Sequence, residues 1–134
     1  MKAMLAAALL ALATTGTALA DGGMMTVPLP DTSGLSEGEA RALITELAQV
    51  NVITSNCPAY PVSDAEWTLI AGTGDQLAAQ LGLDASAYDK QFYGPAFKLL
   101  DDPAACDRIG PRAQPLIARL KAMGGGTTPL SHSQ

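Results

Sequence analysis

The stretch "SEGEARALITELAQVNVITSNC", residues 36–57, decides the fold of this chain. Ser36 and Glu39 form a capping box, in which the Ser hydroxyl and the Glu carboxylate each satisfy a backbone N–H at a helix start. The apolar residues that follow recur at helical spacing and share one face: Ala40, Leu43, Ile44, Leu47 and Val50. We therefore expect a first helix from about Glu37 to Ser55, with Cys57 just past its end.

Start and stop signals for helices recur along the rest of the chain. Ser63 and Glu66 form a second capping box, and we expect the helix after it to weaken at Gly72 and Gly74. Further helical segments are expected around 86–100, from Asp102 through Cys106, and from about Arg112 to Met123. No stretch alternates with the period of a β-strand. The sequence therefore predicts an all-α fold, a small bundle of about four to five short helices.

Cys57 and Cys106 are the two cysteines of the chain. In an exported protein an even number of cysteines predicts a disulfide, and here only one intramolecular pairing exists. The bond would tie the end of the first helix to the fourth helical segment and contribute about 4 kcal/mol in the chain-entropy description. Two free thiols with a redox role are the competing interpretation, which lacks a C-x-x-C pair.

The two ends of the chain differ from its middle. Residues 1–20 combine the positive Lys2, an apolar run and a small-residue cleavage site at Ala18 and Ala20, which is the pattern of a secretory signal peptide. The segment contains no cysteine for a lipid anchor, and we expect a mature chain that begins near Asp21 and is periplasmic or secreted. No other run is long enough to predict a membrane span.

Four parts are expected along the chain. Residues 1–20 are the signal peptide, residues 21–34 an extended or flexible N-terminal arm, residues 35–123 a single helical domain, and residues 124–134 a flexible C-terminal tail. Gly, Pro and Thr dominate the arm, and Gly and Ser punctuate the tail, so neither shows helical periodicity.

Composition argues against several functions. The formal net charge is −5 and there is no run of Lys or Arg, which argues against nucleic acid as a partner. The single histidine, His132, lies in the expected tail, so we expect no His-based catalytic or metal site, and no cofactor. Asp101, Asp102 and Glu66 could serve a carboxylate-based enzyme, but helix capping explains Asp102 and Glu66 better. We therefore expect a protein that is not an enzyme.

Basic residues concentrate toward the C-terminal end of the helical part: Arg108, Arg112, Arg119 and Lys121. Cations near a helix C-terminus are favourable, which explains Arg119 and Lys121 without a function. A docking face for an acidic partner is the alternative interpretation of this group.

All aromatic residues of the chain lie between the two cysteines: Tyr60, Trp67, Tyr88, Phe92, Tyr93 and Phe97. Tyr88 and Phe92 share an apolar helix face and are expected in the core, whereas Tyr93 and Phe97 form a second i, i+4 pair rotated by about 100°. Gly94 and Pro95, between them, predict a break or kink. The second pair is either buried in a small core or presented to a ligand, and the candidate binding surface is Tyr93, Phe97, Trp67 and Tyr60.

An exported helical domain with one long-range disulfide resembles acid-stress chaperones of the HdeA kind in architecture and in the spacing of Cys57 and Cys106. The resemblance implies a response to strongly acidic pH and transfers no functional residue. Our leading hypothesis is an exported binding module whose partner is a periplasmic or extracellular protein. The alternative is a chaperone-like or stress-response protein that exposes apolar surface as its carboxylates protonate.

Overall fold

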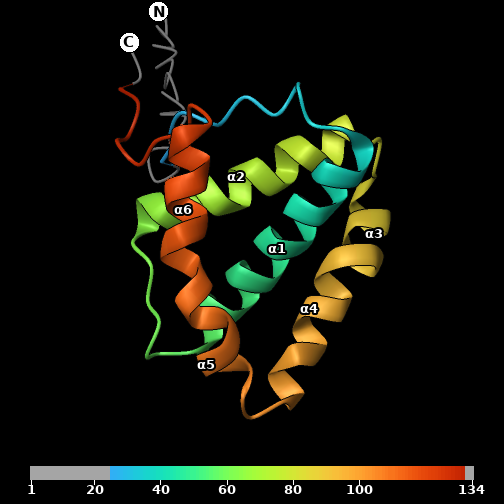
Figure 1. Ribbon diagram of the computed structural model, residues 1–134, viewed down its shortest axis with the longest axis vertical. Helices are drawn as coiled ribbons and strands as arrows, with labels where there is room; N and C mark the ends of the chain where they lie inside the picture. The colour runs from blue at the N-terminus through green and yellow to red at the C-terminus, as the bar shows by residue number, and fades with distance from the viewer. Residues whose placement is uncertain (1–24, 132–134) are drawn as a thin grey trace, which may run out of the picture.

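The computed structural model describes residues 25–131, and over this range the chain is helical with short connections and no strand (Figure 1). Two long helices come first, α1, Glu37–Asn56, and α2, Asp64–Gln80. The third helical segment consists of α3, Ala85–Tyr88, a π-helical turn, Asp89–Tyr93, α4, Gly94–Lys98, and a 3₁₀ turn, Leu99–Asp101. The fourth consists of α5, Ala105–Ile109, a 3₁₀ turn, Gly110–Arg112, and α6, Ala113–Ala122. The all-α prediction is confirmed, while the expected signal peptide and His132 lie outside the described residues.

The capping residues predicted from the sequence begin both long helices. Ser63 accepts a hydrogen bond from the backbone N–H of Glu66 at 3.1 Å, and the Glu66 carboxylate accepts one from the backbone N–H of Ser63 at 2.9 Å, so the second capping box is complete. At α1 only half of the box forms, because Ser36 accepts from the Glu39 backbone N–H while the reciprocal bond is not among the contacts of the described residues. The helix boundaries follow these caps closely.

The expected weakening of the second helix is wrong, since α2 continues past Gly72 and Gly74 without a break. Gly74 is buried, and a β-carbon there would lie 2.3 Å from the Tyr88 hydroxyl oxygen. A glycine in a helix interior costs about 1 kcal/mol relative to alanine, but here it lets α3 approach α2 closely. The packing of Tyr88 against α2 offsets the low helix propensity.

Helix α1 is the centre of the hydrophobic core. The face predicted from residues 40–50 is buried, and further along the helix Ala48, Val52 and Ile53 are buried as well. Helix α2, the third helical segment and the fourth all contact α1, which lies between α6 and α4 in Figure 1. Because every residue from Val50 to Thr54 is buried, the end of α1 must be enclosed on all sides, and the other elements assemble around it.

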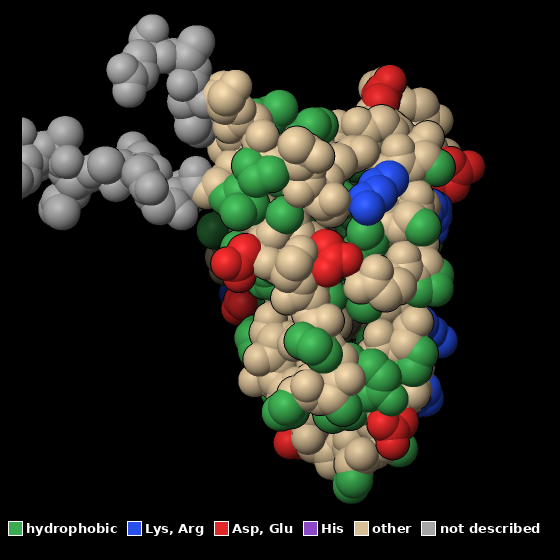
Figure 2. All heavy atoms as spheres, turned by 90° about the vertical axis from the view of Figure 1, so that its left-hand side faces the viewer, with side chains coloured by type: hydrophobic (Ala, Val, Ile, Leu, Met, Phe, Trp, Pro, Cys, Tyr) green, Lys and Arg blue, Asp and Glu red, His purple; other side chains and the backbone are tan. Residues whose placement is uncertain are grey.

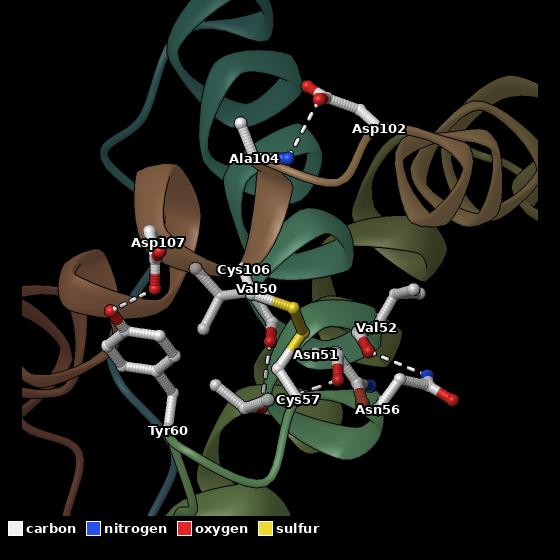
Figure 3. Close-up of a disulfide and its surroundings, with 11 residues drawn as sticks. Val50, Asn51, Val52, Asn56, Cys57, Tyr60, Asp102, Ala104, Cys106 and Asp107 are labelled. Atoms are coloured by element: carbon white, nitrogen blue, oxygen red, sulfur yellow. Dashed lines mark hydrogen bonds between the residues drawn. A yellow bond between two sulfur atoms is a disulfide. The ribbon is translucent and has the colours of Figure 1, made fainter.

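The disulfide between Cys57 and Cys106 is present and joins the C-terminal end of α1 to α5 (Figure 3). The two Cα atoms lie 5.8 Å apart, within the usual range for a disulfide. Cys57 is itself buried in the core. The bond therefore fixes the fourth helical segment to the end of the central helix, as the sequence predicts.

The N-terminal arm and the C-terminal tail lie side by side over their described parts, at the same end of the molecule in Figure 1. Backbone hydrogen bonds of 2.8–2.9 Å link Leu130 to Thr26, Gly126 to Pro28, and Asp31 to Met123. Thr32 is buried and hydrogen-bonds to Gln76 and Gln80 of α2. These bonds attach residues 26–32 to both α2 and the chain that follows α6. Across the described residues, no helix combines the length and apolarity needed to cross a bilayer.

Removal of the disulfide by Cys57→Ser together with Cys106→Ser should lower the free energy of unfolding by about 4 kcal/mol, because the unfolded chain loses a long closed loop. Urea unfolding followed by circular dichroism measures the change. Wild type treated with an alkylating agent without reduction is the control and should be unaltered. Equal unfolding midpoints for the double variant and the wild type would contradict the prediction.

Candidate functional site

Two of the four aromatic residues proposed as a binding surface bond to one buried amide, and a third lies beside one of them. Asn51 of α1 accepts a hydrogen bond at Oδ1 from Trp67 Nε1, at 2.9 Å, and donates from Nδ2 to the Tyr93 hydroxyl oxygen, also at 2.9 Å. The rings of Tyr93 and Phe97 lie next to each other, with centroids 6.4 Å apart. We call Trp67, Tyr93 and Phe97 the aromatic cluster.

The aromatic cluster is assembled from two helical segments, α2 and the third. Trp67 comes from the first turn of α2, Tyr93 from the π-helical turn, and Phe97 from α4. The interruption expected at Gly94 and Pro95 takes the form of this π-helical turn, which is followed directly by α4. Pro95 lies in the first turn of α4, and the helix passes through it without a break, because the residues on its N-terminal side keep helical backbone angles. In the π-helical turn, Tyr93 faces α1, and its hydroxyl reaches Asn51.

The direction of each hydrogen bond at Asn51 follows from the chemistry of its neighbours. An indole N–H can only donate, so the atom facing Trp67 must be the amide oxygen. The amide nitrogen then faces Tyr93, whose oxygen accepts. Asn51 is 9% exposed, whereas Trp67 and Phe97 are 46% and 52% exposed. The indole N–H of Trp67 is therefore hydrogen-bonded inside the protein, and the part of the side chain exposed to solvent is apolar.

Tyr88 and Phe92 support the aromatic cluster from beneath. Both are buried, and the ring of Tyr88 lies 5.0 Å from that of Tyr93. Burial raises the pKa of the Tyr88 phenol far above its ordinary value, and the nearby Tyr93 and Asp75 add to the effect. The Tyr88 hydroxyl has no hydrogen-bond partner among the described residues. The prediction that this pair belongs to the core is confirmed, so that Tyr93 rests on a rigid apolar layer.

Tyr60, the fourth candidate, lies elsewhere. Its ring packs against Gly110, where a β-carbon would lie 2.3 Å from the ring, and its hydroxyl donates to Asp107 Oδ1 at 2.8 Å (Figure 3). The hydrogen bond to the Asp107 carboxylate raises the pKa of Tyr60. Within the described part of the chain, no hydrogen bond or ring contact joins Tyr60 to the aromatic cluster. Tyr60 instead joins the loop after α1 to α5, beside the disulfide.

A groove of about 480 Å³ runs along α2 from Trp67. Its lining residues are Met25, Asp64, Trp67, Thr68, Ala71, Gly72 and Asp75. Those from α2 form two neighbouring i, i+4 rows, and the middle of the groove carries the small residues Thr68, Ala71 and Gly72. Asp64 and Asp75 lie at opposite ends, and neither takes part in an ion pair of the described residues. The groove therefore combines an exposed aromatic ring with two unpaired carboxylates.

Of the three carboxylates considered for catalysis, Glu66 closes the capping box of α2, whereas the expected capping role of Asp102 is wrong, because Ala104 is the residue that precedes α5 and Asp102 accepts from it in the turn before the helix. Backbone hydrogen bonding from Ser63 is the main cause that lowers the pKa of Glu66. For Asp102 the bond from the Ala104 backbone N–H, at 2.9 Å, and then the Arg108 guanidinium lower the pKa. Asp101 is exposed. Among residues 25–131 there is also no cluster of three or more His, Cys, Asp or Glu side chains that could hold a metal ion.

The basic residues near the C-terminal end are partly engaged on the surface. Arg108 pairs with Asp102 at 2.9 Å, and Arg119 lies 3.7 Å from Glu46. Figure 2 shows Lys and Arg side chains along one edge of the face it displays, with acidic side chains over other parts. Exposed ion pairs of this kind contribute little to stability, about 0–1 kcal/mol each. Nothing in these contacts singles out a docking face for an acidic partner.

Sequence reasoning missed Asn51, the residue that organises the aromatic cluster. A signal was available, because Asn51 interrupts the apolar run from Val50 to Ile53 on a helix that is buried on nearly all sides. A polar side chain in such a place needs hydrogen-bond partners, and aromatic residues with polar edges can supply them. The identity of those partners depends on tertiary contacts over 16 and 42 residues of sequence.

Substitution of Asn51→Leu should lower the free energy of unfolding by about 1–3 kcal/mol, because the buried ends of Trp67 and Tyr93 lose their partners. The fluorescence of Trp67, the only tryptophan, should change in the folded state as its ring is released. Asn56→Ala is the matched control, since Asn56 is exposed and bonds only to the Val52 carbonyl of its own helix. A stability loss at Asn51 no larger than that at Asn56 would refute the role of the amide.

The capping box of α2 predicts a pH dependence of stability. The pKa of Glu66 is lower in the folded protein than its ordinary value of 4.5, so the ionised carboxylate stabilises the fold above that pH. This contribution should be lost as the pH falls below about 4.5. We expect Glu66→Gln to lower stability by about 0.5–1 kcal/mol at pH 7 and to have no effect near pH 2.

Glu39→Gln provides the control for this measurement, because Glu39 occupies the same position in α1 without closing its capping box. It should reduce stability less than Glu66→Gln in urea unfolding at pH 7. Equal losses at the two positions, or a loss at Glu66 that persists near pH 2, would contradict the assignment of the pH dependence to the closed box.

No match for this chain is found among models of protein families, among curated proteins or among solved structures. The comparisons therefore indicate neither a function nor a set of site residues for this chain. Function has to be inferred from the aromatic cluster, the groove beside it and the disulfide.

Proposed function

We propose that this protein is a small exported binding module that contacts a protein partner through the aromatic cluster. The observation that carries the proposal is the anchoring of Trp67 and Tyr93 by the buried amide of Asn51, which leaves the Trp67 ring 46% exposed. A purely structural Trp would bury its ring along with its N–H. Here a buried polar interaction holds an apolar side chain at the surface in a fixed position.

Such an arrangement suits protein recognition. Aromatic side chains are enriched at the centres of interfaces, where they contribute much of the binding energy. A side chain already held in its bound conformation loses less entropy when a partner binds. Phe97, 52% exposed and beside Tyr93, extends the apolar area away from Trp67. A partner with apolar side chains could cover both rings.

Export is the second part of the proposal. The bond between Cys57 and Cys106 is compatible with an oxidising compartment, where disulfides form and persist. The signal-peptide pattern of residues 1–20 supports the same location. We therefore expect the partner to be a periplasmic or extracellular protein.

The contacts of the carboxylates weigh against the enzyme alternative. Glu66 accepts hydrogen bonds from the Ser63 backbone and from Gln114, and Asp102 is held by Ala104 and Arg108. General acid–base catalysis needs a carboxyl group whose pKa lies near the working pH, whereas these contacts lower the pKa of both groups. Helix capping accounts for Glu66, and a turn hydrogen bond with an ion pair accounts for Asp102, without a catalytic role.

A chaperone-like role is a second proposal, supported by the acid-sensitive cap at Glu66 and by the exposed rings of the aromatic cluster. Protonation of capping carboxylates would loosen the helix starts and uncover more of the core. Binding of a hydrophobic dye and suppression of client aggregation, measured from pH 7 to pH 2, would test it. Unchanged behaviour over this range would remove the second proposal and leave the first.

Phe97→Ala and Tyr93→Ala should each reduce recovery of the partner from a periplasmic extract at least about tenfold, the loss expected for a central aromatic contact. Phe97→Ala should leave stability within about 1 kcal/mol of the wild type, because half of the ring is already exposed. Leu130→Ala is the matched control, since Leu130 is 50% exposed but lies on the tail. Recovery that is unaffected by Phe97→Ala, or equally affected by Leu130→Ala, would refute the proposed surface.

A further inference from the structure

We propose that the groove along α2 binds an extended basic segment of the partner, with a Lys or Arg side chain over the Trp67 ring and a second one at Asp75. The inference rests on the proposed function, because Trp67 belongs both to the aromatic cluster and to the groove. It adds the chemical class of the ligand and the path that the ligand follows.

The shape of the groove fits an extended chain. Thr68, Ala71 and Gly72 form its middle, and they are smaller than Trp67 and Asp75 toward the ends. A β-carbon at Gly72 would lie 2.9 Å from Leu29 Cδ2, which shows that the N-terminal arm packs against the same turn of α2. Met25, from the arm, adds an apolar side to the groove. Its volume of about 480 Å³ leaves room for several residues of a peptide.

The charges of the groove select a cationic ligand. Asp64 and Asp75 are exposed, no Lys or Arg is among the lining residues, and the three ion pairs of the described residues use other carboxylates. The carboxylate of Asp64 is stabilised by the helix dipole, because Asp64 lies in the first turn of α2. Asp75 lies in the interior of α2, where the dipole gives no such stabilisation. A cation between Trp67 and Asp64 would gain from both the ring face and the carboxylate.

The two carboxylates also set a spacing for the ligand. Eleven residues of α-helix separate Asp64 from Asp75, which corresponds to about 16 Å at 1.5 Å per residue. An extended chain advances about 3.3 Å per residue, and its side chains return to the same face every second residue. Two basic residues four positions apart therefore project to one side and span about 13 Å, and their long side chains can cover the remainder.

The probe for the test is a short Gly/Ser peptide with two Arg residues four positions apart. A second peptide carries citrulline, a neutral side chain of similar shape, in place of each Arg. Trp67 is the only tryptophan, so its fluorescence in the full chain reports on occupation of the groove. We expect saturable binding of the Arg peptide with a Kd of about 0.1–1 mM at low salt, weaker binding at high salt, and no binding of the citrulline peptide.

Asp75→Asn and Asp64→Asn should each weaken binding of the Arg peptide by about threefold to tenfold. Asp101→Asn is the matched control, because Asp101 is equally exposed but does not line the groove, and it should change the affinity by less than about twofold. Circular dichroism of each variant checks that the helices are intact, and Trp67 remains available as the reporter in all of them.

Four results would overturn the inference, three from the binding measurements and one from self-association. The first three are equal binding of the citrulline peptide, wild-type affinity in the variant that combines Asp64→Asn with Asp75→Asn, and no binding of the Arg peptide up to millimolar concentration. Self-association detected by sedimentation, with Trp67 fluorescence that depends on protein concentration, would assign the groove to a second copy and also overturn it. If any of these results is obtained while Phe97→Ala still reduces recovery of the partner, the inference about the groove is wrong and the proposed function remains supported.

Discussion

The burial of α1 is the constraint on which the rest of the structure depends. Toward its C-terminal end the buried residues are not confined to a stripe, because every residue from Val50 to Thr54 is buried. One partner helix cannot cover such a surface, so α2 and the third and fourth helical segments each cover part of it. The disulfide then fixes the fourth segment at the end of α1. The positions of all functional candidates follow from how each element lies on this one helix.

The burial of α1 also determines the geometry of the aromatic cluster. Asn51 lies in the buried run of α1, where a polar side chain without a hydrogen bond would cost free energy. Its amide therefore needs hydrogen-bond partners on the neighbouring elements. It finds them on α2 and on the π-helical turn, which places Trp67 and Tyr93 at the junction of three segments. The interaction that satisfies the core is thus also the interaction that fixes two aromatic rings at the surface.

Local rules were sufficient to predict much of the fold. Capping at Ser36 and Ser63 depends on contacts over three residues, which the sequence displays directly. Helical periodicity likewise placed residues 40–50 in the core. The pairing of Cys57 with Cys106 followed because no other intramolecular pairing exists.

Features that depend on distant contacts escaped prediction. The continuity of α2 through Gly74 reflects the approach of Tyr88, and the separation of Tyr60 from the other aromatic residues reflects its packing on Gly110. Periodicity also cannot foresee a π-helical turn, in which one residue shifts the faces of all that follow. The sequence left open whether Tyr93 and Phe97 are buried or presented; Phe97 is exposed and Tyr93 packs against the core, and the link of Tyr93 to Trp67 required knowledge of where Asn51 lies.

Trp67 is where the two proposals meet, and its surroundings explain why both can apply to one surface. Its N–H is used inside the protein, so the ring can contribute only apolar contact or its π face. On the side of Tyr93 and Phe97 the neighbours are aromatic, whereas along α2 the neighbours are small residues bounded by carboxylates. A partner that offers apolar side chains followed by a basic extended stretch would match both environments in turn. Asn51 determines how these two environments adjoin, because its amide holds the Trp67 ring at the boundary between the aromatic neighbours and the groove along α2.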